Sequence, residues 1–375
     1  MAAIDVTFDI PAKIAEGLAD QTLFRNGGVI QDSSGRVVMW LRELSSNGQA
    51  VEGIVPAGGT SSAMSLVGVG SMLTLGVSVL GFGVLYSKVK ELESQIQGVK
   101  ELLETIDQKI DMSFYANFRA ALDLARNAFT MSDQNNRHNS ALQAINRFLE
   151  AEHIYTDLLK KELETKGLLC NKYLLTLCFA YLAEIRCYLE LGESDTALRR
   201  FQEANSEIQK YIEQYIEVLL TKNPAIYLHP KLKDSINLSR LTGVFQCFDS
   251  GLNEGGVFEV LRDDLFQAGN NYEKWMGELP PAVIAPWKVK KGFWGIPDEG
   301  KQAIFERLPQ VVDEMESAIE TSHRFGAYAY ELNLLIKAKV SMKQWENLKP
   351  KQLPVEQANF IYIVPPNPVM LESAV

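Results

Sequence analysis

The sequence predicts a mainly α-helical protein: an elongated helical bundle with long coiled-coil-forming helices and a small N-terminal β-hairpin module. Three observations lead to this fold class. Residues 85–110 carry an unbroken heptad of apolar side chains, and residues 114–220 alternate helical apolar periodicity with polar turns. Residues 54–87 contain no charged side chain. Because 46% of the 375 residues are hydrophobic and 22% are charged, the chain can bury a sizeable core.

Charge and the pattern of cysteines and histidines exclude several classes of function. The formal net charge of −10 repels phosphate backbones, so we expect no nucleic-acid partner. The four histidines are scattered and the four cysteines form no CxxC pair, so the sequence predicts no metal site and no cofactor. The apolar surroundings of three cysteines indicate free thiols in a reducing compartment. The first residues lack the features of a secretory signal, so we expect cytoplasmic synthesis and membrane association when the protein is active.

Residues 1–53 are the first predicted domain, a small mixed α/β module. Residues 4–10 alternate in the manner of a strand, and Pro11 can open a short helix that ends at Leu18. Residues 27–41 then predict two short strands around a turn at 32–35.

Residues 54–87 are the second predicted domain, an apolar, glycine-rich membrane segment. A helix over its strongest part, residues 65–86, reaches about 33 Å, and the hydrocarbon core of a bilayer is about 30 Å thick. Five glycines in a helix exposed to water would each cost about 1 kcal/mol relative to alanine, whereas small residues allow close helix packing in membranes. The predicted membrane-inserting residues are Leu66, Val67, Gly68, Gly70, Leu73, Leu75, Gly76, Val79, Leu80, Gly81, Phe82, Gly83 and Leu85.

Three interpretations of this apolar segment remain open at the level of sequence. It can be a helix or helical hairpin buried in a core, a stable single-pass anchor, or a segment that is shielded first and inserted later. A hairpin would turn near Gly70 or Gly76.

A heptad seam follows the apolar segment directly. Apolar residues recur at alternating spacings of four and three, and the same register continues backwards through Phe82, Ser78 and Leu75. The pattern predicts a coiled-coil helix over 88–112, and since no proline intervenes, one helix from about 65 to about 130 is possible. Its partner is either a symmetry mate or another long helix of the chain. The seam residues are Val89, Leu92, Ile96, Val99, Leu103, Ile106 and Ile110.

Residues 114–220 predict a series of antiparallel helices. The polar stretch 132–139 separates the first two, and the third ends near Gly192. Ser194 or Asp195 can cap the fourth. The predicted helices cover 118–131, 140–164, 168–191 and 194–220.

The third and fourth predicted helices share a pattern of residue sizes around the turn at Gly192. The aromatic Tyr188 precedes the turn. Small, large and small residues follow it, at Ala197, Phe201 and Ala204. This pattern resembles one tetratricopeptide repeat over about residues 175–208, although Ile185 and Gln209 stand where the family has a small residue and a proline. The resemblance implies a closely packed helix hairpin without a repeat array.

Residues 221–297 predict two further helices between loops. Glycines and prolines make 221–256 mostly loop, with a short helix at about 232–247. A helix over 258–279 follows, and then a proline-rich irregular loop.

A second long helix is predicted near the C-terminal end. It begins at Asp298, is expected to kink at Pro309, and continues over 311–348. This helix is a candidate partner for the heptad seam. Residues 349–375 form the last predicted domain, an extended tail in which 358–364 can add to a sheet as a strand. The apolar face of the long helix comprises Val312, Met315, Ile319, Phe325, Leu332, Leu335 and Ile336.

No catalytic constellation stands out in the sequence. The chain contains no P-loop, nucleophile elbow or HExxH motif, and Gly68 and Gly70 lack the third glycine of a dinucleotide fingerprint. Asp263 and Asp264 fit a solvated pair on a helix surface better than a metal site. We therefore predict no catalytic residues and a function other than catalysis.

One loop combines tryptophans with lysines, which is the composition of a membrane interface. The alternative is that its tryptophans plug the helical body. The residues of this possible interfacial loop are Trp287, Lys288, Lys290, Lys291 and Trp294.

The apolar segment joined to a heptad helix resembles the architecture of α-helical pore-forming toxins over roughly residues 54–130. The resemblance implies a membrane-inserting effector or toxin that oligomerises through its heptad helix, with a lipid membrane as partner. The alternative is a scaffold that residues 65–86 anchor permanently in the membrane. In its helical bundle, residues 88–348, the coiled coil oligomerises and the helical hairpins from residue 114 onward bind a helical protein partner.

Overall fold

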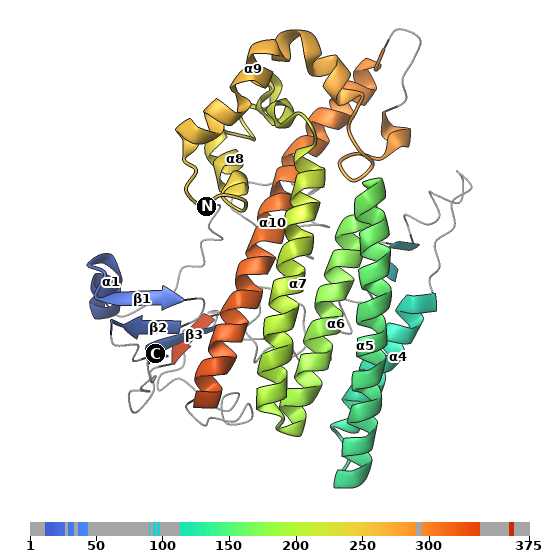
Figure 1. Cartoon of the computed structure of the whole chain (residues 1–375), viewed down its shortest axis with the longest axis vertical. Helices are drawn as coiled ribbons and strands as arrows, with labels where there is room; N and C mark the ends of the chain where they lie inside the picture. The colour runs from blue at the N-terminus through green and yellow to red at the C-terminus, as the bar shows by residue number, and fades with distance from the viewer. Residues whose placement is uncertain are drawn as a thin grey trace.

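The computed structural model describes residues 12–26, 29–33, 37–43, 90, 93–94, 96–97, 113–289, 295–337 and 360–363 of the chain. Within these residues the protein is mainly helical and contains one small antiparallel sheet (Figure 1). The mainly α fold class and the hairpin near the N-terminus are therefore confirmed.

The sheet begins with elements of the N-terminal module. A short helix, α1 (Ala12–Ala19), precedes strands β1 (Leu23–Asn26), β2 (Val29–Asp32) and β3 (Val37–Glu43). Neighbouring strands pair antiparallel. The short helix and the β2–β3 hairpin match the sequence prediction, whereas β1 was not predicted because its four residues, LFRN, alternate too briefly to stand out.

The fourth strand comes from the far end of the chain. β4 (Phe360–Ile363) pairs antiparallel with β3, with Leu41 opposite Tyr362. The predicted ability of 358–364 to form a strand is confirmed, and its partner is the N-terminal hairpin. The sheet is tied to the helical body by the Tyr330 hydroxyl, which donates a hydrogen bond to the side-chain oxygen of Gln31.

The first two helices of the body are α4 (Ser113–Ala128) and α5 (Gln134–Thr165). The turn between them is shorter than the predicted polar stretch 132–139, most of which is helical. The reason is a helix cap: the Asp133 carboxylate accepts a hydrogen bond from the Asn136 backbone N–H at 2.8 Å, so the helix starts at the next residue.

The next two helices are α6 (Cys170–Leu191) and α7 (Ser194–Leu220), close to the predicted bounds. Gly192 adopts a positive φ of 82°, a conformation that glycine reaches without strain. The predicted cap at Ser194 or Asp195 is wrong. The turn is so tight that Glu193 takes the capping position without a side-chain bond, while its N–H donates back to the Tyr188 carbonyl at 2.9 Å.

A smaller region of short helices follows α7. Two 3₁₀ turns, η3 (Pro224–Leu228) and η4 (Pro230–Leu232), lead into α8 (Leu238–Phe245). The predicted helix at 232–247 is therefore shorter than expected. The next helix, α9 (Glu254–Met276), starts four residues before its predicted position of 258, because Asn253 caps it by accepting from the Gly256 N–H at 3.0 Å.

The last helix, α10 (Asp298–Lys337), follows a loop that contains the short turn η5 (Pro286–Lys288). It starts at the predicted residue and continues through Pro309. Its predicted apolar face is confirmed by the burial of Val312, Met315, Phe325, Leu332 and Leu335.

The helices form a bundle in which α6 is the central element. α4 packs on α5, α5 on α6 and α6 on α7, and α10 returns to pack on α7 (Figure 1). α6 is buried along almost its whole length, including all three of its cysteines. Figure 1 shows α8 and α9 gathered at one end of α7 and α10. The residues of the tetratricopeptide-like pattern lie in this core: Ala197, Phe201 and Ala204 are buried, and Phe201 packs edge-on against Phe325 of α10 at 5.8 Å.

Candidate functional site

The site that bears most directly on function is the junction where the heptad helix meets the body. Residues 93–94 and 96–97 are helical, and Glu93 Oε2 lies 3.1 Å from Arg119 Nη1 of α4. Ile96, one turn further along, has no exposed surface and belongs to the same core as Tyr115. We call these residues, together with Tyr155 of α5, the docking junction.

Aromatic rings pack together within the docking junction and next to it. The rings of Tyr115 and Tyr155 are 5.3 Å apart, and Tyr155 lies 6.3 Å from Tyr173 of α6. The Tyr115 hydroxyl donates to Thr176 Oγ1 at 3.1 Å, since Thr176 itself donates to the Lys172 carbonyl. Burial raises the pKa of both Tyr115 and Tyr155, and the nearby Glu93 carboxylate raises it further. Both hydroxyls are therefore neutral, and they serve packing rather than acid–base chemistry.

The partner of the heptad seam stays a prediction. The sequence offered either a symmetry mate or the helix that is now α10, and of the seam the structure describes Ile96. The neighbouring Glu93 pairs with Arg119 of α4. α10 packs on α7 and α8, and its Phe325 contacts Phe201.

A second polar centre is a buried charge cluster that links three helices. The Arg200 guanidinium of α7 donates through Nε to both oxygens of Glu184 of α6, at 2.8 and 2.9 Å. Its Nη2 donates to Glu152 Oε2 of α5 at 2.6 Å, and its Nη1 donates to Glu203 Oε2 of its own helix at 2.6 Å. Glu152 and Glu184 are buried, at 5% and 0% exposed.

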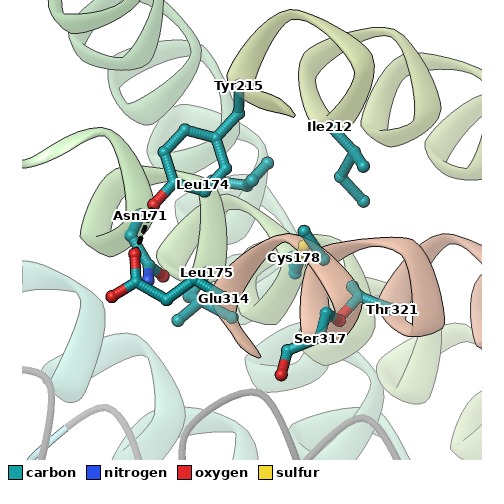
Figure 2. A pocket seen from close by; sticks show the side chains of 10 residues that line it. Asn171, Leu174, Leu175, Cys178, Ile212, Tyr215, Glu314, Ser317 and Thr321 are labelled. Carbon is teal, nitrogen blue, oxygen red and sulfur yellow. Dashed lines mark hydrogen bonds between the residues drawn. The ribbon is translucent and has the colours of Figure 1, made fainter. Parts of the chain in front are cut away.

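A third centre is a small cavity of about 30 Å³ between α6, α7 and α10. Figure 2 shows Tyr215 and Glu314 pointing toward one another, and the Tyr215 hydroxyl donates to Glu314 Oε2 at 3.0 Å. The other carboxylate oxygen of Glu314 lies 2.7 Å from Arg307 Nη2. The cavity has room for about two water molecules, which is too little for an organic substrate. Its lining is Asn171, Leu174, Leu175, Cys178, Ile212, Tyr215, Glu314, Ser317, Ala318 and Thr321.

The surroundings of the four cysteines and of His229 do not favour a nucleophilic dyad. Burial raises the pKa of Cys170 to about 12 and that of Cys247 to about 11, and it raises the pKa of Cys178 and Cys187 as well. A thiol with a raised pKa stays protonated and is a poor nucleophile. His229 stacks between Tyr272 and Phe305, at 4.4 and 4.6 Å, and burial lowers its pKa. Within the residues that the structure describes, no group of three metal-ligating side chains occurs.

Most of the residues singled out from the sequence lie outside the described residues. This applies to every predicted membrane-inserting residue from Leu66 to Leu85 and to every seam residue except Ile96. Of the possible interfacial loop, Trp287 is half-buried and Lys288 is exposed, while Lys290, Lys291 and Trp294 lie outside. Among the helices that the structure does describe, none has the length and apolar character needed to cross a bilayer.

Sequence reasoning did not identify the buried charges. A signal was nevertheless present for Glu152, which shares the spacing of Phe148, Tyr155 and Leu159 on the buried stripe of α5. Glu184 likewise stands inside the long apolar run of α6. Their partner Arg200 carried no such signal, because it sits in a polar stretch of α7 and its neighbours across the bundle depend on the tertiary fold.

Comparison with protein-family models, with curated proteins and with solved structures gives no match for this chain.

Proposed function

We propose that this chain is a non-enzymatic, membrane-inserting helical protein that disrupts or perforates a bilayer. In this proposal the apolar segment 54–87 inserts, and the heptad helix then assembles with other copies as a coiled coil in an elongated bundle. The protein is made in the cytoplasm and becomes membrane-associated when active. The observation that carries the proposal is the burial of a seam residue, Ile96, in the core of the body, nine residues after a stretch of 34 successive uncharged residues ends.

The docking junction supports a stored form of the heptad helix. Ile96 is buried in the core of the body and is not available to a second copy, because one apolar face cannot pack on two partners at once. The Glu93–Arg119 ion pair fixes the same helix on its polar side. We therefore infer that assembly through the seam requires the helix to leave the body first.

The neutral thiols and the small cavity support the non-enzymatic part of the proposal. A nucleophile needs an adjacent base or a lowered pKa. The described cysteines have neither, and burial moves their pKa in the opposite direction.

Fractionation and vesicle leakage test the proposal together. The protein is expressed without detergent, separated into supernatant and membrane pellet, and added to liposomes that contain a quenched dye. We expect protein in the supernatant that releases the dye. Gly76→Leu should abolish release because it blocks close helix contact in the membrane, whereas Val77→Leu, a matched apolar change at the next position, should leave release intact.

The outcomes separate the alternatives. Protein that resides only in the membrane pellet and releases no dye would favour the membrane-anchored scaffold. Protein that stays in the supernatant and ignores vesicles would exclude both functions and favour a buried structural role for residues 54–87.

Charge reversal at the docking junction tests the stored form. Arg119→Glu places two carboxylates together, and it should shorten the half-time of dye release by about five- to tenfold, given that a partly exposed ion pair contributes up to about 1 kcal/mol. Combining it with Glu93→Arg restores an opposite-charge pair and should restore the slow rate. Arg126→Glu is the matched control, since Arg126 pairs with Asp123 on its own helix. Equal rates in all variants would contradict the stored form.

A further inference from the structure

The charge cluster around Arg200 contains more carboxylates than this single guanidinium can neutralise. Three carboxylates, those of Glu152, Glu184 and Glu203, converge on one guanidinium. Glu203 is half-exposed and also pairs with Arg199, so water and a second cation share its charge. Both buried carboxylates, those of Glu152 and Glu184, pair with Arg200.

Each of the three helices contributes charged or titratable groups to this cluster. Glu152 stands alone on α5. The remaining groups are Tyr181, Glu184 and Tyr188 on α6, and Arg199, Arg200 and Glu203 on α7. Tyr181 places its ring face 5.6 Å from the Arg200 guanidinium carbon. Because burial raises the pKa of both tyrosines, neither hydroxyl carries charge near neutral pH. The buried part of this cluster therefore contains two carboxyl groups and one guanidinium.

Glu152 accepts fewer hydrogen bonds from Arg200 than Glu184 does, and it is therefore the carboxylate that carries the uncompensated charge. Arg200 engages both oxygens of Glu184 but only Oε2 of Glu152. Glu152 Oε1 is buried and accepts no hydrogen bond from any described donor. An ionised carboxylate with one bare oxygen in a low-dielectric interior is costly, whereas a carboxylic acid is tolerated there.

We propose that the α5–α6–α7 cluster binds a single proton, shared between Glu152 and Glu184, and that loss of this proton acts as a pH-sensitive release of α5 from the bundle. With the proton bound, one carboxylic acid and one carboxylate surround Arg200. Without it, two adjacent carboxylates share one guanidinium and repel each other. The repulsion is relieved when α5, which contributes a single group, moves outward.

The direction of titration agrees with this geometry. Burial, and then the Glu184 charge, raise the pKa of Glu152 to about 9, against an ordinary value of 4.5. A group whose folded pKa is raised stabilises the fold fully below its ordinary pKa and loses that contribution as the pH rises through the folded value. The stability that this proton contributes therefore falls progressively between about pH 4.5 and pH 9, and the folded protein releases the proton itself as the pH approaches about 9.

The release would act on the docking junction, and in this respect it rests on the proposed function. Glu152 is one helical turn before Tyr155, whose ring packs on Tyr115 beneath the heptad helix. Outward movement of α5 at Glu152 displaces Tyr155, which belongs to the same buried core as Ile96. Alkalinisation is thus expected to loosen the heptad helix.

The proton site is tested on the intact chain without vesicles. Glu152→Gln keeps the shape of the protonated acid and removes its titration. From about pH 5.5 to pH 8 the unfolding equilibrium constant of the wild type should rise by about tenfold per pH unit relative to Glu152→Gln, which is the slope for one linked proton. Glu203→Gln, on the exposed side of the same arginine, is the control and should keep the wild-type slope. Parallel stability curves for the wild type and Glu152→Gln would overturn the proposal.

Infrared spectroscopy gives a second readout that needs no unfolding. The wild type at pH 7 should show the carbonyl band of a protonated, buried carboxylic acid, and the band should disappear as the pH rises past about 9. Glu184→Gln should abolish the band at pH 7, because Glu152 then has Arg200 to itself and ionises. If Glu152→Gln does not fold, the wild-type spectrum alone decides, and absence of the band at pH 7 overturns the proposal.

The link to the docking junction has its own measurement. Hydrogen exchange of residues 93–97 should accelerate several-fold between pH 7 and pH 9.5 in the wild type, after correction for the intrinsic rate, but not in Glu152→Gln. A confirmed proton site with unchanged exchange would overturn the release of α5. Failure of dye release from liposomes would affect the proposed function alone, since none of these measurements involves a membrane.

Discussion

At the scale of single residues, the body holds its buried charges through specific partners and not through solvent. Glu314 lies inside the bundle, yet one oxygen accepts from the Tyr215 hydroxyl and the other faces Arg307. Arg307 in turn donates through Nε to the Val283 carbonyl at 2.8 Å. The chain of contacts ties α7, α10 and the loop before η5 together.

Removing the cation from this chain should cost more than removing the hydroxyl. Arg307→Met leaves the Glu314 carboxylate buried without its cation, and we expect a loss of about 3–5 kcal/mol in the free energy of unfolding. Tyr215→Phe deletes one hydrogen bond to a carboxylate and should cost about 1.5–3 kcal/mol. Urea denaturation followed by circular dichroism measures both.

The matched control for that comparison is an exposed arginine. Arg147 pairs with Glu150 one turn along α5, and both side chains are more than half exposed. Arg147→Met should therefore change the free energy of unfolding by less than about 1 kcal/mol. Similar losses for Arg147→Met and Arg307→Met would mean that burial does not govern these ion pairs.

At the scale of elements, the helices were easier to predict than their ends. The bounds of α6 and α7 follow from a long apolar run, a turn glycine and a second periodic stretch. The starts of α5 and α9 were misplaced because Asp133 and Asn253 cap them, and one polar side chain among several gives no unique signal. β1 and the pairing of β4 escaped prediction for another reason: four residues carry little periodicity, and a partner more than 300 positions away leaves no local trace.

The buried charges show why the candidate site was harder to predict than the fold. The position of Glu152 on the apolar stripe of α5 could be read from the sequence, but its partners on α6 and α7 could not. Likewise the heptad predicted that Ile96 is buried, while the pairing of the neighbouring Glu93 with Arg119 of α4 depends on the tertiary arrangement. The apolar periodicity of a helix predicts which of its faces is buried, but it does not identify the element that packs against that face.

One arginine fastens the short helix α8 to the long helix α10. Arg240 donates through Nε and Nη2 to the two oxygens of Glu316, at 2.8 and 2.7 Å, and Nη2 also reaches Asp313 Oδ1 at 2.6 Å. A planar guanidinium makes this forked contact, whereas an ammonium group cannot.

Arg240→Lys should therefore loosen α8 although it keeps the charge. We expect a loss of about 1–2 kcal/mol, because hydrogen bonds to charged groups contribute about 1.5–3 kcal/mol and lysine retains part of the attraction. Hydrogen exchange should speed up in α8 and remain unchanged in α6. Equal acceleration in both helices would indicate general destabilisation and contradict a local fastening.

At the scale of the whole molecule, the described residues form a helical bundle and a small sheet, and Val29 of β2 belongs to the buried core of the bundle. The helical bundle shares one core around α6, and the four-stranded sheet is built from strands at both ends of the described sequence. The Tyr330–Gln31 hydrogen bond joins the two. This arrangement predicts that the sheet can open while the bundle stays folded.

Proline in the last strand tests this separation. Ile361→Pro fixes φ and removes a backbone donor from β4, so protection of β3 amides against hydrogen exchange should fall by at least about tenfold. Protection in α5 to α7 should be retained. Ile361→Thr, which preserves the preference for extended structure, is the control. Simultaneous loss of protection in the helices would show that sheet and bundle unfold as one unit.

The pairing of β4 with β3 has a consequence for biosynthesis. Glu43 closes β3 and Phe360 opens β4, so the ribosome adds 316 residues, 44–359, between the two strands. At roughly 5–20 residues per second, β3 waits about 15–60 s for its neighbour to be translated. The nascent chain therefore carries an unpaired sheet edge throughout the period in which its helices form, and this edge is where a chaperone that binds extended segments would be expected to act.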